Sequence, residues 1–141
     1  MKILLLIFYL VLVSCSNKYV IADENIISKF SLSGGDLLLM VKVTDTQYTS
    51  YYPDKDNCPD ELYCIPKCFW FNHDAKVLNV LSGEYKEKNI KFSVLQHVDN
   101  SEEILNEWYV QLRKFKQKSI ISKLKSKYYV EKHNAEFSLC Y

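Results

Sequence analysis

Glycine is scarce in this chain, contributing three of the 141 residues. Two are adjacent, Gly34 and Gly35, and the third is Gly83. This scarcity excludes the glycine-rich loops that hold phosphate groups, and the Gly-x-Ser-x-Gly turn that presents a nucleophilic serine is missing as well. A loop-rich scaffold is also disfavoured, whereas eleven tyrosines suit an amphipathic β surface.

Closely spaced histidines are missing too. The chain has His73, His97 and His133, and no two of them form the short His-x-His or His-x-x-x-His pairs of many metal sites. The triplet Asn72-His73-Asp74 is interpreted as a turn. We therefore expect no metal site, no cofactor and no catalytic residue, and we do not expect an enzyme.

The chain also lacks an apolar run long enough for a permanent membrane span. The run from Ile3 to Val13 follows Met1-Lys2, and it is shorter than the roughly 20 residues that a transmembrane helix needs. One positive residue, an apolar stretch and then small residues are typical of a signal peptide. The sequence therefore predicts export, with residues 1–14 removed.

The end of this segment is more specific. Leu12-Val13-Ser14-Cys15 resembles a bacterial lipobox, in which a small residue precedes the cysteine that receives a lipid. The resemblance implies lipidation of Cys15, and the non-acidic Ser16 implies an outer membrane lipoprotein that faces the periplasm. Each buried methylene of the anchor would contribute about 0.8 kcal/mol. The alternative, an ordinary cut after Ser16, would release a soluble secreted protein.

The rest of the chain is long enough for a single domain. We expect residues 15–35 to form the lipidated cysteine and a tether, with a short helix or edge strand around Ile26, Ile27 and Phe30. Residues 36–141 then form one disulfide-stabilised β domain.

The number of cysteines, five, supports export to an oxidising compartment. Loss or lipidation of Cys15 leaves an even set, which suits two disulfides in an oxidising environment. The set consists of Cys58, Cys64, Cys68 and Cys140. Their spacings fit no usual zinc ribbon. Three pairings are possible, and we favour one bridge inside the 58–68 loop and one from that loop to Cys140.

Alternating apolar residues predict a mainly β fold. Asp36 to Val43 has the composition of a buried strand, and residues 44–59 read as a long connection. A hairpin is predicted from Ala75 to Leu81 and from Asn89 to Val98, joined by a polar stretch that contains Gly83.

Residues 101–118 fit either a helix or a strand. We expect a short helical turn near Ser101 and then a strand from about Glu107. Two further strand-like stretches, Tyr128 to Val130 and Ala135 to Leu139, complete the pattern.

Two of these predicted strands resemble strands of a known superfamily. Ala75 to Gly83, with Val77, Val80 and Leu81 before the glycine, resembles a strand and turn of the netrin-module and tissue-inhibitor-of-metalloproteinase superfamily. Trp108 to Leu112 is similar to a later strand of that family, and a C-terminal cysteine such as Cys140 is common there. The resemblance implies a small OB-like barrel. Those inhibitors chelate a protease zinc with a free N-terminal cysteine, which a lipid-blocked Cys15 cannot do, so no functional residue is carried over.

Charge is unevenly distributed along the chain. Residues 16–112 carry a net charge of −6, whereas residues 113–132 carry +7. Such a segment suits an anionic lipid, a glycan or an acidic protein, although a solvated lysine-rich face is the simpler explanation. Nucleic acid is not an expected partner outside the cell. The candidate binding surface consists of Tyr51, Tyr52, Lys123, Lys125, Lys127 and Tyr129.

These observations predict a small, mainly β domain with an OB-like barrel, a short helix and two disulfides. The expected function is binding or structural, in the cell envelope, with the domain held on the membrane by its lipid. The alternative is an inhibitor of a secreted hydrolase such as a protease or a lysozyme, either soluble or anchored.

Overall fold

The computed structural model describes residues 21–53, 55, 66–97, 107–135 and 139–140. Within those ranges, no helix has the length and apolar character needed to cross a membrane. Several predicted features lie outside the described residues. They are the signal segment 1–14, Cys15, the cut after Ser16, the cysteines Cys58 and Cys64, and the helical turn near Ser101.

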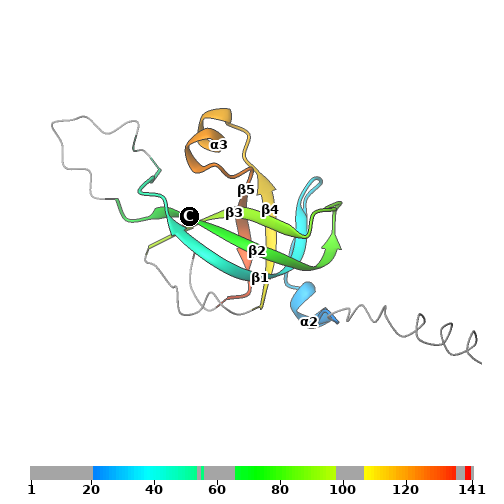
Figure 1. The fold of residues 1–141 in the computed structure, drawn as a ribbon. Helices are drawn as coiled ribbons and strands as arrows, with labels where there is room; N and C mark the ends of the chain where they lie inside the picture. Colours follow the sequence, from blue (N-terminus) through cyan, green and yellow to red (C-terminus); the bar gives the residue numbers. More distant parts are fainter. Residues whose placement is uncertain (1–20, 54, 56–65, 98–106, 136–138, 141) are drawn as a thin grey trace, which may run out of the picture.

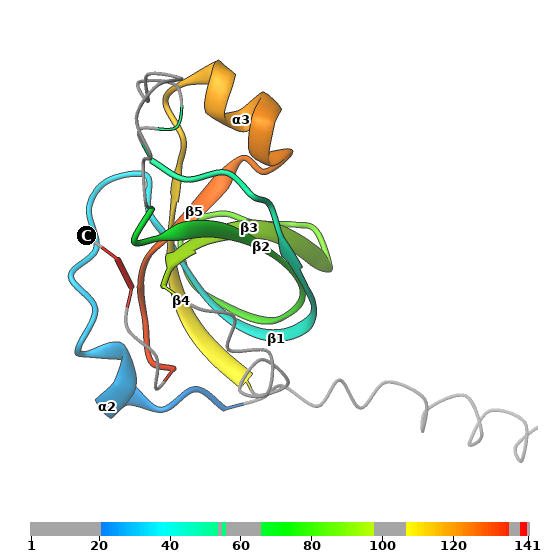
Figure 2. The same cartoon turned by 90° about the vertical axis from the view of Figure 1, so that its left-hand side faces the viewer.

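Five strands close into a barrel (Figures 1 and 2). They are β1 (Leu37–Tyr48), β2 (Phe69–Ser82), β3 (Asn89–Gln96), β4 (Glu107–Lys114) and β5 (Tyr128–His133). Their order around the barrel is β1-β2-β3-β5-β4, and β1 pairs with β4 to close it. All pairs are antiparallel except β3 with β5, which is parallel. This is the arrangement of an OB-like barrel, so the predicted fold class is confirmed.

The barrel interior is filled by alternate residues of each strand, because successive side chains of a strand point to opposite faces. Trp108 and Phe92 are the largest apolar side chains at its centre, with exposed fractions of 1% and 0%. The other buried members of this core are Leu37, Leu39, Val41, Val43, Ala75, Ile90, Val94, Val110, Leu112 and Val130. Apolar residues at alternate positions therefore point into the barrel and leave the intervening side chains of each strand on its outer surface.

The predicted hairpin is present, and β4 begins at Glu107 as expected. Two predictions about β1 and β2 were wrong. Residues 44–48 belong to β1 rather than to a connection, because they pair with β2 as far as Tyr48 opposite Phe71. Asn72-His73-Asp74 is not a turn but lies within β2. Side chains common in turns are accommodated there because neighbouring strands and a helix supply their hydrogen bonds.

In the part of the chain that the structure describes, two short helices lie outside the barrel (Figure 1). The first, α2 (Glu24–Ile27), is capped by Asp23, whose side chain accepts a hydrogen bond from the Asn25 N–H. The second, α3 (Lys118–Leu124), connects β4 to β5 and was not predicted from the sequence. It ends where Lys125 adopts a left-handed conformation, with φ of 52°.

Asp36 ties the start of β1 to β4. Its carboxylate accepts hydrogen bonds from Arg113 Nε at 2.9 Å and from Gln111 Nε2 at 2.7 Å. Arg113 also pairs with Glu131 of β5 at 2.8 Å. The hydrogen bond from Arg113 holds the pKa of Asp36 below its usual value despite burial of the carboxylate. These polar groups therefore stabilise the fold.

Candidate functional site

An aromatic group covers the outer side of the barrel beside α3. Trp70 of β2 contacts Phe115, with ring centroids 5.4 Å apart, and Phe115 contacts Tyr129 of β5 at 5.0 Å. Tyr51 is held next to this group, because its carbonyl accepts a hydrogen bond from the Trp70 N–H at 2.8 Å. All four rings are half-buried. Three segments distant in sequence thus converge on one surface.

One lysine of the β4–β5 connection borders these rings. Lys123 Nζ lies 5.1 Å from the centroid of the Tyr51 ring, within the range of a cation–π interaction. We name Tyr51, Trp70, Phe115, Tyr129 and Lys123 the aromatic–lysine surface. This surface presents flat apolar ring faces beside a positive charge.

Further lysines of this connection and of the end of β4 add positive charge. They are Lys114, Lys116, Lys118, Lys125 and Lys127, and all are exposed. The ion pairs formed between described residues involve Lys91 and Arg113 instead. The positive charge of these five lysines is therefore not neutralised by any carboxylate in the part of the chain that the structure describes.

A buried polar pair fixes α3 against the barrel. Asn72 Nδ2 donates to the carbonyl oxygen of Leu124, the last residue of α3, at 2.6 Å. The Asn72 Oδ1 accepts from Ser93 Oγ at 2.7 Å. Since Asn72 and Ser93 have exposed fractions of 7% and 0%, these bonds are shielded from water. The lysine-bearing connection is therefore attached to β2 and β3 at a defined point.

A second aromatic group lies near the end of β1. Tyr48 contacts Phe69 and Phe71, with centroids 5.3 Å away in each case, and Tyr52 contacts Phe69 at 5.8 Å. Tyr48 is 55% exposed, which makes it one of the most exposed large apolar side chains among the described residues. The predicted pair Tyr51 and Tyr52 is therefore divided between two aromatic groups.

A groove of about 200 Å³ lies next to Trp70 and Tyr129. Leu95, Val130, Glu131, Leu139 and Cys140 complete its lining. It forms where β3 and β5 diverge, because they pair only at Phe92–Tyr128 and Ser93–Tyr129. The chain at Leu139 bridges to Gln96 and fills part of that gap.

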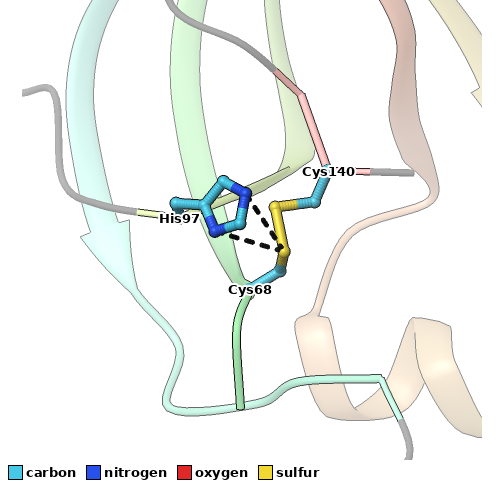
Figure 3. Close-up of side chains that lie close together, drawn as sticks. All are labelled: Cys68, His97 and Cys140. Atoms are coloured by element: carbon cyan, nitrogen blue, oxygen red, sulfur yellow. Dashed lines mark hydrogen bonds between the residues drawn. A yellow bond between two sulfur atoms is a disulfide. The ribbon is translucent and has the colours of Figure 1, made fainter.

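The predicted bridge from the cysteine loop to Cys140 is present, and its partner is Cys68. Figure 3 shows His97 beside this disulfide, with its Nδ1 3.7 Å and its Nε2 4.0 Å from Cys68 Sγ. Cys140 is 8% exposed, whereas His97 is exposed. The side of this three-residue group that His97 forms therefore faces solvent.

The other two histidines lie away from this group. His73 is completely buried and stacks on Phe92, and its Nδ1 is hydrogen-bonded to Thr46 Oγ1 at 2.8 Å. His133 stacks on Trp108, with ring centroids 5.9 Å apart. Burial lowers the pKa of His73 to about 3 and that of His133 to about 4. Both rings are therefore uncharged near neutral pH.

The structure brings together three of the predicted surface residues, Tyr51, Lys123 and Tyr129. Lys125 and Lys127 line a separate shallow groove with Tyr85 and Tyr128. Trp70 and Phe115 were not predicted as surface residues. Strand alternation turns Phe71 inward, where it is buried, and Trp70 outward.

No match was found for this chain among protein-family models, curated proteins or solved structures.

Proposed function

We propose that this chain is an exported, non-catalytic binding domain of the cell envelope, anchored by a lipid on Cys15, and that its ligand is an anionic glycan. The supporting observation is the convergence of the half-buried rings of the aromatic–lysine surface with the ammonium group of Lys123, which lies 5.1 Å from the centroid of the Tyr51 ring. Rings stack on the faces of sugars, while lysines attract carboxylate or sulfate groups.

The position of the surface on the barrel supports this proposal. The aromatic–lysine surface is formed by β2, by the start of β5, by the connection between β1 and β2, and by the connection between β4 and β5. OB folds bind oligosaccharides and oligonucleotides with the face of their second and third strands and with these two connections. Export makes a glycan the more accessible of these ligands.

A binding assay with charge-reversed variants tests the ligand class. Lys116→Glu with Lys118→Glu reverses two exposed charges in the connection that carries Phe115 and Lys123, and we expect affinity for oligosaccharides of a uronic acid to fall about tenfold or more. The control is Lys86→Glu with Lys88→Glu, which reverses two exposed lysines between β2 and β3. Equal affinity of both variants, or equal binding of a neutral oligosaccharide by the parent, would contradict the proposal.

Lipid anchoring is tested separately by the intact mass of the protein from its native membrane fraction. We expect a chain that begins at Cys15 and carries acyl groups. A chain that begins at Asn17 without lipid would overturn the anchor and leave a secreted protein.

Inhibition of a secreted hydrolase is the second candidate function. The sequence resembles a superfamily that includes protease inhibitors and has OB-like barrels. The closed barrel and the disulfide that holds the C-terminal segment are in keeping with that resemblance. An inhibitor would suppress a lysozyme or a protease at equal molar amounts. Loss of that inhibition in a Tyr48→Ala variant, with the lysine variants still active, would favour inhibition over glycan binding.

A further inference from the structure

Cys68, His97 and Cys140 meet at one edge of the barrel, although they are far apart in sequence (Figure 3). Phe69 pairs with Gln96 across β2 and β3, so Cys68 and His97 are the next residues outward on the two strands. Cys140 is placed beside them because its N–H donates to the Leu95 carbonyl at 2.9 Å. Their sulfur and nitrogen atoms all lie within 4.8 Å of one another.

The tautomer of His97 follows from its neighbour. Its Nδ1 lies 2.6 Å from the Lys67 carbonyl oxygen, and a carbonyl oxygen can only accept, so Nδ1 carries the proton. The neutral ring then has its lone pair on Nε2. Metal-binding histidines usually donate their other N–H to a carbonyl or a carboxylate in this way. His97 is therefore oriented as a ligand by the backbone that precedes β2.

We propose that these three residues form a redox-gated site for a soft metal ion such as Zn²⁺. In the oxidised protein the two sulfurs are joined to each other. Reduction by an external dithiol adds two electrons and two protons and gives two thiols, while the reductant becomes a disulfide. Binding of Zn²⁺ then releases both thiol protons and leaves two thiolates and the neutral His97 Nε2 as ligands.

The geometry needs little adjustment for this change. Ligand atoms about 2.0 to 2.3 Å from a tetrahedral metal are separated from one another by about 3.3 to 3.8 Å. The sulfurs must separate from the 2.08 Å of the disulfide, whereas His97 already lies at 4.0 Å from Cys68 Sγ. Since His97 is exposed, water can take the fourth position.

The inference goes beyond the proposed function, since glycan binding does not require it. Either the disulfide or the metal would link the C-terminal segment to the start of β2. The segment that fills the gap between β3 and β5 would then stay attached in both redox states.

Cobalt titration of the reduced protein tests the site. The parent protein is the full chain with Cys15→Ser, Cys58→Ser and Cys64→Ser, since these substitutions remove competing thiols. A phosphine keeps Cys68 and Cys140 reduced. We expect one equivalent of Co²⁺ to give the visible absorption of a tetrahedral thiolate complex, and Zn²⁺ to displace it. His97→Ala should weaken binding about tenfold or more, whereas Lys67→Ala keeps the carbonyl and should bind as the parent does. No cobalt spectrum, or unchanged affinity in His97→Ala, would overturn the proposal.

A redox titration covers the case in which the reduced chain loses its fold. In glutathione buffers, Zn²⁺ should shift the Cys68–Cys140 equilibrium toward the dithiol in the parent, and much less in His97→Ala. Zinc captured by cysteines of an unfolded chain would shift both proteins equally, and that result would contradict a site that includes His97.

Discussion

At the scale of single residues, Asn72 makes structural hydrogen bonds that its neighbours in the sequence do not predict. Asparagine and aspartate on both sides of His73 favour a turn when read locally. In the barrel, Asn72 instead joins Ser93 of β3 to the last carbonyl of α3. A sequence pattern cannot reveal this role, because both partners are distant along the chain.

Asn72→Ala should lower the free energy of unfolding by about 2–3 kcal/mol, since it leaves a buried carbonyl and a buried hydroxyl without this partner. Urea unfolding measures the change. Asn25→Ala is the matched control, because Asn25 is exposed, and it should stay within about 0.5 kcal/mol of the parent. Equal effects of the two substitutions would contradict the buried bonds.

The buried histidines predict an acid-sensitive core. Unfolded histidine binds a proton near pH 6.5, whereas burial holds the pKa of His73 at about 3 and that of His133 at about 4. The unfolded chain therefore binds more protons between these values. Stability is fully present above pH 6.5 and falls as the pH is lowered, by about 1.4 kcal/mol per pH unit for each histidine.

Urea unfolding at several pH values measures this slope. His73→Gln should reduce this slope by about 1.4 kcal/mol per pH unit, because the variant takes up one proton fewer on unfolding in acid. A slope that His73→Gln leaves unchanged would show that His73 does not couple folding to pH.

At the scale of elements, the turn after β2 depends on Gly83. Its φ is +82°, and a Cβ there would lie 2.7 Å from Leu37 Cδ2 and 2.9 Å from the Asp36 carbonyl oxygen. The sequence predicted a connection at this point from its polar composition. It did not predict that β1 would pass so close.

Gly83→Ala should destabilise the protein by about 2–3 kcal/mol, through the left-handed backbone and through the contact with Leu37. Gly34→Ala is the control, because a Cβ at that position would have no neighbour within 4 Å and the φ of Gly34 is not positive. Thermal unfolding of both variants measures the difference, and a Gly83→Ala protein as stable as Gly34→Ala would contradict the close approach.

The C-terminal segment depends on its disulfide. The Cys68–Cys140 bridge spans a sequence separation of 72, and closure of a loop of that length is worth about 4 kcal/mol in the chain-entropy model. Cys68→Ser with Cys140→Ser should therefore lower the free energy of unfolding by about that amount in denaturant titrations. A stability equal to that of the parent would mean that the bridge adds nothing beyond the β3 contacts.

At the scale of the whole molecule, the barrel was predicted from a family resemblance. Alternation of apolar residues was sufficient to predict a mainly β fold and the hairpin of β2 and β3. It failed where polar residues continue a strand, as in residues 44–48, since only pairing with β2 keeps them extended. It also failed for α3, a short lysine-rich helix whose one buried residue is Leu124. Convergence of Tyr51, Trp70 and Phe115 could not be predicted, because it arises from closure of the barrel.

Chemical-shift mapping with an acidic oligosaccharide tests the central claim, that the aromatic–lysine surface binds an anionic glycan. We predict that the indole N–H of Trp70 and the amides of Tyr51, Phe115 and Lys123 shift together, that added salt weakens the effect, and that a neutral oligosaccharide of equal length gives smaller changes. No shifts at these residues, or shifts confined to the Tyr48 group, would contradict the account.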